Sequence, residues 1–163
     1  MLYREFSDQE TIDQQNNPLS TASDSGDIIT KREQKSTLAR KVLKGHLGLR
    51  FGPTVSEFLD IFPSGNTKSP LHLFIHGGYW RRFTARDFSF VAPELVEAGI
   101  SVAVMNYALC PSVTVQEIVR QTRSAIFWLM ENAAKYGLAK KMLVSSSFIL
   151  TICLQPARII TVM

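Results

Sequence analysis

The sequence is poor in the side chains that bind metals or form disulfide bridges. It contains two cysteines, Cys110 and Cys153, which are not spaced as a CxxC pair, and three histidines, His46, His72 and His76. Two cysteines cannot supply a four-ligand zinc site on their own. We therefore expect two buried, reduced thiols, no metal site and no cofactor.

Long apolar runs are also missing. The longest extends from Met142 to Leu154 and is interrupted by three consecutive serines and by Thr151. It falls short of the roughly 20 apolar residues that cross a bilayer. The first residues do not combine a basic segment with an apolar one, as a secretory signal does. These observations predict a cytoplasmic protein with no membrane partner.

Acidic residues are nearly absent from one stretch of the chain. Between residues 31 and 50, Glu33 is the one acid among seven basic residues, whereas the whole chain has a net charge of +4. A basic stretch can bind phosphate groups. Because no aromatic residues alternate with the basic ones, we expect the exposed face of a helix and no nucleic-acid partner.

The composition itself is globular, with 45% hydrophobic and 20% charged residues, and strands alternate with helices along the chain. Apolar runs predict strands at 56–62, 71–75, 101–107 and from about 142 onward. The capping boxes Thr84-x-x-Asp87 and Thr114-x-x-Glu117 predict helix starts, and the second helix should end at Gly137. This order predicts an α/β fold with a mostly parallel, doubly wound sheet.

The N-terminal region has a different character. Residues 1–36 are polar and rich in turn formers, which predicts an arm with little core of its own. A short helix is expected at 37–49, with Leu38, Val42 and His46 on one face.

Two adjacent glycines follow the strand predicted at 71–75, in the stretch His76-Gly77-Gly78-Tyr79-Trp80. In open α/β sheets, ligands bind beyond the carboxyl ends of the strands. Glycines leave backbone N–H groups unshielded, and such groups can donate to the oxygen that becomes negative when a carbonyl is attacked. The position and residues of this loop therefore favour an oxyanion loop of the HGG type over a simple turn.

The loop and its surroundings resemble the arylformamidase (kynurenine formamidase) family of α/β-hydrolases, and the resemblance covers about residues 1–137. The stretch His76-Gly77-Gly78-Tyr79-Trp80 matches the HGGYW motif of that family. Further similar stretches are 4–7, 16–18, Gly45-His46-Leu47-x-Leu49-Arg50-Phe51-Gly52-Pro53, 88–93, Asn106-Tyr107-x-Leu109-Cys110-Pro111 and 117–119.

The resemblance implies hydrolysis of the formyl amide of N-formylkynurenine in tryptophan breakdown, with a small-molecule aryl formamide or ester as partner. Gly77, Gly78 and Tyr79 would offer backbone donors to the oxyanion. His76 would brace the loop and would not be the general base. Tyr79 and Trp80 would line the aryl pocket, and the alternative for Trp80 is plain packing beside the loop.

The resemblance fails at the catalytic nucleophile. Such enzymes place a serine on a sharp G-x-S-x-G turn after a strand, and in this family the stretch reads like V-S-G-H-S-A-G-G. Here Val144-Ser145-Ser146-Ser147-Phe148 follows, so that Phe148 occupies the position of the nucleophile and the glycines are missing. We expect no catalytic residue in this chain, because a serine without a positioned base is a poor nucleophile.

The residues from Leu138 onward contain no Gly, Asp or Glu. The acid and the histidine of the triad follow the nucleophile in chain order. We expect that a frameshift, a premature stop or alternative splicing replaced the family's continuation. The predicted division is an arm at 1–36, the N-terminal part of an incomplete α/β-hydrolase domain at 37–137, and a divergent tail at 138–163.

Two other functions stay open. The first is a non-catalytic binding protein that keeps an aryl pocket, or pairs with a partner or with itself through an exposed sheet edge. Co-purification with a full-length partner would favour it. The second is a carboxylesterase relative, which a preference for simple aryl esters over the formamide would identify.

Overall fold

The computed structural model describes residues 6, 8–16, 25–67, 69–139 and 142–146. Five strands form one sheet in the order β1-β2-β4-β3-β5. Their bounds are β1 His46–Arg50, β2 Phe58–Phe62, β3 Leu71–Ile75, β4 Ser101–Met105 and β5 Met142–Ser146. The helices are α1 Gln9–Asn16, α3 Ser25–Val42, the 3-10 helix η1 Ala85–Val91, α4 Ala92–Glu97, α5 Val115–Asn132 and the 3-10 helix η2 Ala133–Tyr136.

The sheet is mixed. Strand β3 pairs in parallel with β4 and with β5, as the alternation of strands and helices predicted. Strand β2 is antiparallel to β4 and to β1, which differs from that prediction. No helix lies between β2 and β3 among the described residues. The chain therefore reverses direction there instead of crossing over the sheet.

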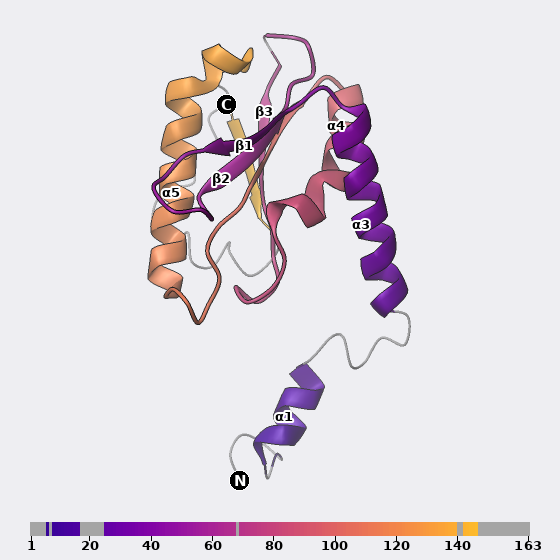
Figure 1. Ribbon diagram of the computed structural model, residues 1–163, viewed down its shortest axis with the longest axis vertical. Coiled ribbons are helices and arrows are strands. Elements are labelled where there is room, and N and C mark those ends of the chain that lie inside the picture. Colours follow the sequence, from indigo (N-terminus) through magenta and orange to yellow (C-terminus); the bar gives the residue numbers. More distant parts are fainter. Residues whose placement is uncertain (1–5, 7, 17–24, 68, 140–141, 147–163) are drawn as a thin grey trace.

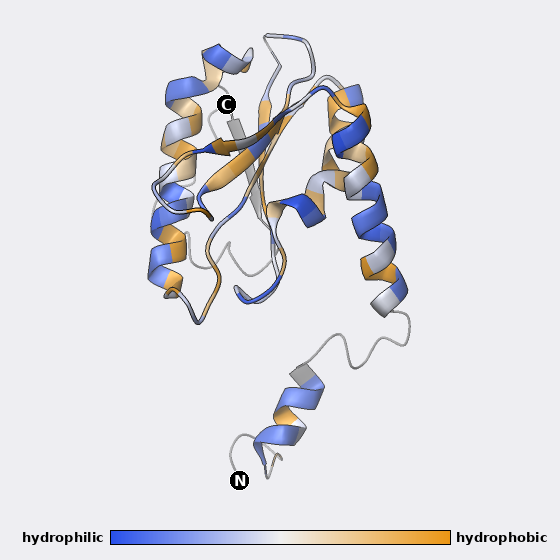
Figure 2. Ribbon diagram, viewed as in Figure 1, coloured by the Kyte–Doolittle hydropathy of each residue, from blue (hydrophilic) through white to orange (hydrophobic). Residues whose placement is uncertain are grey.

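Helices cover both faces of the sheet (Figure 1). Helices α3, η1 and α4 lie on one side and α5 on the other, and Figure 2 shows apolar residues concentrated on the strands between them. The larger core cluster, on the α5 side, includes Leu59, Ile61, Leu73, Ile75, Ala103, Met105, Ile118 and Leu129. The smaller cluster, on the α3 side, includes Phe62, Ala85, Ala92, Val102 and Val104. Among the described residues, no helix is both long and apolar enough to cross a membrane.

Several predicted starts and stops are confirmed. Thr84 and Asp87 form the expected capping box, although the element that follows is the 3-10 helix η1. Helix α4 follows, and Pro93 lies in its first turn, where a missing N–H breaks no helical bond. The hydroxyl of Thr114 accepts the Glu117 N–H at 3.3 Å and begins α5. After η2, the chain leaves the helix through Gly137, whose φ of 69° lies in the left-handed region.

The helix predicted at 37–49 is wrong in both bounds. Helix α3 extends from Ser25 to Val42, and His46 instead begins the edge strand β1. The helix has no broad apolar stripe for periodicity to detect, and its buried side includes the small residues Ser36 and Ala39. Helix α1 also lies in the stretch predicted to be an arm.

The edge strand β1 contains a bulge that a buried carboxylate holds in place. His46 pairs with Ile61 but Leu49 pairs with Leu59, so that two residues of β1 lie opposite Asp60. The N–H of Gly48, whose φ is 68°, donates to Asp60 Oδ1 at 2.7 Å. Asp60 Oδ2 is buried and has no hydrogen-bond partner among the described residues. Burial therefore raises the pKa of Asp60 above its ordinary value of 3.8, against the opposing effects of the Gly48 N–H and two arginines.

We expect Asp60→Asn to raise the free energy of unfolding near neutral pH by about 1 kcal/mol, because the amide oxygen keeps the bond to Gly48 and the substitution removes a buried charge that has no salt bridge among the described residues. The folded protein binds the Asp60 proton more tightly than the unfolded chain does. Wild-type stability should therefore fall as pH rises from 3.8 through the raised pKa.

Urea denaturation at neutral pH and below pH 3.8 measures this effect. The gap between Asp60→Asn and wild type should close in acid, where the wild-type carboxyl is protonated in both states. A variant that is less stable than wild type at neutral pH would mean that attraction to Arg40 and Arg86 outweighs the burial of the charge.

Candidate functional site

The candidate site is the loop that follows β3 at the carboxyl ends of the parallel strands (Figure 1). The N–H groups of Arg81 and Arg82 both donate to the Gly78 carbonyl, at 3.0 and 3.1 Å, and close a tight turn. Gly78, Tyr79 and Trp80 have φ values of 120°, 55° and 56°. Three consecutive residues in the left-handed region are unusual, because side chains disfavour it. Strain of this kind is typical of functional loops.

At position 78, this turn accepts no residue other than glycine. A Cβ at this position would lie 2.4 Å from the Arg82 carbonyl oxygen and 2.9 Å from Phe83 Cδ2. The close atom belongs to the backbone and cannot rotate away. The glycine predicted to form the loop is therefore required both by its φ and by the space around it.

The turn leaves backbone donors free. Among the described residues, the N–H groups of Gly78 and Tyr79 donate no hydrogen bond. Two adjacent free N–H groups in left-handed conformation make a concave, electropositive surface that can receive an anionic oxygen. This arrangement can stabilise charge that develops on a carbonyl oxygen, as an oxyanion hole does.

His76 is buried beneath the loop. Its ring stacks on Tyr107 and on Phe88, with centroid distances of 4.2 and 5.5 Å. Nδ1 of the neutral ring donates to the Gly77 carbonyl at 2.8 Å, and the Tyr107 hydroxyl donates to the His76 carbonyl at 2.7 Å. Burial lowers the pKa of His76 to about 4. The ring is therefore neutral at physiological pH and is held by aromatic packing.

The two aromatic residues of the loop have different environments. Tyr79 is 53% exposed and can contact a ligand. Trp80 packs against the larger core cluster, and its carbonyl accepts the Cys110 N–H at 2.7 Å. Its Nε1 is buried without a hydrogen-bond partner among the described residues. Trp80 thus packs beside the loop, and its predicted place in an aryl pocket stays a prediction.

The other histidines lie away from the loop. His72 lies within β3 and not at its carboxyl end. His46 lies at the start of β1 and contacts Tyr136 edge-on at 5.0 Å.

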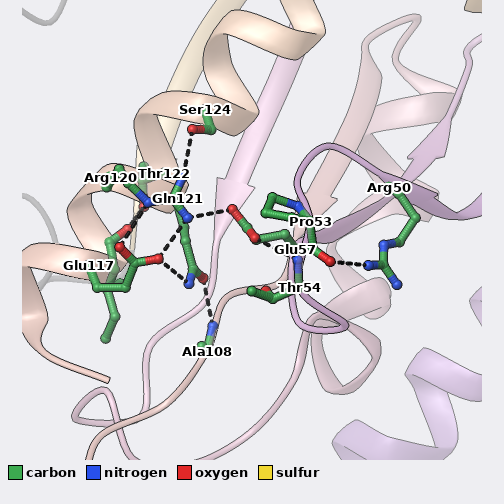
Figure 3. Close-up of polar contacts among 11 residues, drawn as sticks. Arg50, Pro53, Thr54, Glu57, Ala108, Glu117, Arg120, Gln121, Thr122 and Ser124 are labelled. Carbon is green, nitrogen blue, oxygen red and sulfur yellow. Dashed lines mark hydrogen bonds and ion pairs between the residues drawn. The ribbon is translucent and has the colours of Figure 1, made fainter. Parts of the chain in front are cut away.

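An ion-pair network, which sequence reasoning missed, connects the segment before β2 to helix α5 (Figure 3). The buried carboxylate of Glu57 accepts a hydrogen bond from Arg120 Nη2 at 2.7 Å and another from the Thr54 N–H at 2.9 Å. Burial raises the pKa of Glu57, but these donors outweigh it and hold the pKa below its ordinary value of 4.5. Arg120 also binds Glu117 at 2.6 Å, and these bonds lower the pKa of Glu117 to about 2.

The network continues to the candidate loop through buried Gln121. Gln121 Nε2 donates to Glu117 Oε1 at 3.0 Å, and its Oε1 accepts the Ala108 N–H at 2.9 Å. Two residues after Ala108, the Cys110 N–H holds the Trp80 carbonyl. The sequence offered one signal for these residues, the capping box that contains Glu117. Nothing in it indicated the pairing of Glu57 with Arg120.

The predicted nucleophile position lies outside the described residues, as do Ser147 and Cys153. Cys110 is only partly buried, which differs from the buried thiol expected there. Ser145 and Ser146 belong to β5, which agrees with their expected place in a strand. Ser146 pairs with Ile75, directly before His76. The end of β5 thus lies beside the start of the candidate loop.

A groove of about 510 Å³ lies beside α5, and no loop residue lines it. Its lining residues are Phe51, Arg120, Arg123, Ser124, Phe127, Trp128, Glu131 and Asn132. The candidate site therefore depends on the geometry of the loop and not on this groove.

A sheet between two helical layers, with a twin-glycine loop after a central strand, defines the class of protein. The chain has the α/β-hydrolase fold in incomplete form. Within that class it belongs to the BD-FAE family, whose model matches residues 59–148.

Kynurenine formamidases from two organisms are similar to part of this chain. The kynurenine formamidase of Drosophila melanogaster is 35% identical over 85 residues, which cover 51% of this chain and 28% of that protein. The kynurenine formamidase of Salmo salar is 27% identical over 100 residues, which cover 60% of this chain and 34% of that protein. The chain thus spans about a third of the length of these curated relatives.

A solved structure shares the fold. The crystal structure of a provisionally assigned thioesterase from Silicibacter sp. TM1040 superposes with a TM-score of 0.71 and 25% sequence identity. The match covers 80% of this chain and 49% of that one.

Proposed function

We propose that this chain carries the oxyanion half of an acyl-hydrolase site for aryl formamides such as N-formylkynurenine, and that it does not turn over the substrate on its own. The observation that carries this proposal is the left-handed turn at Gly78 and Tyr79, whose N–H groups are free among the described residues. The names of the related kynurenine formamidases support the substrate class.

The chemistry follows from what the loop can donate. Attack on a formyl carbon places negative charge on the carbonyl oxygen, and the N–H groups of Gly77, Gly78 and Tyr79 would stabilise it. His76 would brace the loop as a neutral ring, because a buried imidazole with a pKa of about 4 is a weak base at neutral pH. Tyr79, with its exposed ring, and Trp80 would contact the aryl group.

The missing half of the chemistry is the nucleophile. In the sequence, Phe148 occupies the position at which the family has its serine, and no G-x-S-x-G stretch occurs around it. A phenyl ring cannot attack a carbonyl carbon. The proposal is therefore that the chain binds the aryl formamide but does not form a covalent acyl intermediate with it.

Two measurements on the purified chain test the proposal. Calorimetric titration with N-formylkynurenine should show saturable binding, and formate release should stay at the buffer rate. Gly78→Val should abolish the binding because it removes the turn that exposes the donors. Gly65→Val is the matched control, since Gly65 also has a positive φ of 84° but no atom lies within 4 Å of its Cβ position.

Each result has a clear meaning. Failure of the chain to bind N-formylkynurenine would contradict the substrate class. Hydrolysis above the buffer rate that is lost in Gly78→Val but kept in Gly65→Val would contradict the claim of inactivity.

A carboxylesterase or thioesterase relative is the second candidate, supported by the solved thioesterase-like structure that superposes on this chain. The same oxyanion donors would serve an ester, since its carbonyl oxygen also becomes negative. Titration with a simple aryl ester of matched size separates the two. Tighter binding of the ester than of the formamide would favour this second candidate.

A further inference from the structure

Helix α3 holds the segment that directly follows the candidate loop. The Ser36 hydroxyl donates to the Asp87 carbonyl at 2.8 Å and accepts the Phe90 N–H at 3.2 Å. Arg40 Nη1 donates to the Ser89 hydroxyl at 3.0 Å. These bonds attach α3 to η1, one turn or more beyond the loop itself.

Arg32, on the same helix, makes a different kind of contact. Its guanidinium carbon lies 4.1 Å from the centroid of the Phe83 ring and 4.8 Å from that of Phe88. Nε and Nη2 are buried and have no hydrogen-bond partner among the described residues. Burying guanidinium donors without acceptors is unfavourable, so the two aromatic faces are what stabilises the cation there.

Both rings contact residues of the loop. Phe83 itself has a φ of 74°, in the left-handed region, and its Cδ2 atom fills the space at the Gly78 Cβ position, 2.9 Å away. Phe88 stacks on His76, whose Nδ1 donates to the Gly77 carbonyl. The Arg32 guanidinium therefore contacts both rings that pack against the loop.

We propose that Arg32 is a positioning residue for the loop at 76–82, because its guanidinium fixes the Phe83 and Phe88 rings that hold Gly78 and His76 in place. The inference rests on the proposed function only for the role of the loop. The geometry it predicts can be measured without substrate. Helix α3 would then be part of the site's support, although no residue of α3 belongs to the HGGYW motif.

Amide hydrogen exchange tests the proposal, because three bonded amides report on the loop. The Arg81 and Arg82 N–H groups bind the Gly78 carbonyl, and the Cys110 N–H binds the Trp80 carbonyl. In Arg32→Gln these amides should exchange about tenfold faster, as expected when a cation–π contact is lost and the loop opens locally. Arg32→Lys keeps the charge but not the planar group, so its loop amides should exchange at rates between those of wild type and Arg32→Gln.

Ser36→Ala is the matched control on the same helix. It removes hydrogen bonds between α3 and η1 and leaves both rings covered, so it should speed exchange at Phe90 but not at Arg81 or Arg82. Equal acceleration of the loop amides in Ser36→Ala and Arg32→Gln would overturn the proposal, because Arg32 would then act only by docking the helix. Unchanged loop exchange in Arg32→Gln would overturn it as well.

If Arg32→Gln does not fold, comparing loop exchange in Arg32→Lys with that in Ser36→Ala tests the proposal in the same way. Exchange in the β3–β4 ladder should stay at the wild-type rate in each folded variant. Because no substrate is present, failure of the chain to bind an aryl formamide would remove the proposed function and leave this result standing.

Discussion

Gly78→Ala is expected to lower the free energy of unfolding by about 3 kcal/mol, which combines a disfavoured backbone conformation with a steric clash. The φ of 120° belongs to a region that side chains rarely adopt, and the new Cβ would meet the Arg82 carbonyl oxygen at 2.4 Å. The protein can relieve this contact only by opening the turn, which separates the Arg81 and Arg82 N–H groups from the Gly78 carbonyl.

Gly65→Ala separates the two causes. Gly65 also has a positive φ, of 84°, but no atom lies within 4 Å of its Cβ position. Its replacement should cost about 1 kcal/mol, from backbone strain alone. Urea denaturation of both variants measures the difference, and equal losses would show that the loop accommodates a Cβ at Gly78 without opening.

The sequence predicted the parts of the fold that local patterns determine. The strand at Leu71–Ile75 has the predicted bounds, and the capping residues Thr84 and Thr114 lie where the pattern placed them. These features depend on short apolar runs and on bonds between residues three positions apart. The twin glycines likewise marked the loop, and at Gly78 the φ of 120° and the nearby Arg82 carbonyl oxygen require a glycine.

The features that the sequence missed depend on contacts between distant residues. Helix α3 packs Ser36 and Arg32 against η1, so its inner face does not look apolar. The bulge in β1 depends on Asp60, twelve residues after Gly48. Left-handed backbone at Tyr79 and Trp80 follows from the closure of the turn and not from their own preferences.

The pairing of Glu57 with Arg120 joins residues 63 positions apart, the largest separation among these contacts. Its removal should cause the second large loss of stability. Arg120→Met leaves the buried Glu57 carboxylate with Thr54 as its remaining hydrogen-bond partner among the described residues. A buried carboxylate without its counter-ion is strongly destabilising. Because 47% of the Arg120 side chain is exposed, solvent reduces the effect, and we expect a loss of about 2 kcal/mol near neutral pH.

The pH dependence of that loss identifies its cause. In wild type the lowered pKa of Glu57 contributes stability that is present above 4.5 and is lost as pH falls through the folded-state pKa. Without Arg120, burial dominates and the pKa should rise above 4.5, so the variant's stability should increase as pH falls toward that value. The gap between the two proteins should therefore narrow in acid.

Arg123→Met is the matched control, because Arg123 is exposed on the same helix and has no ion pair among the described residues. Its effect should stay within about 0.5 kcal/mol. The double variant Glu57→Gln with Arg120→Met should be more stable than the sum of the single losses predicts, because it no longer buries an unpaired charge. Additive losses, or a gap that is the same at every pH, would mean that Arg120 stabilises the protein through packing along α5 and not through Glu57.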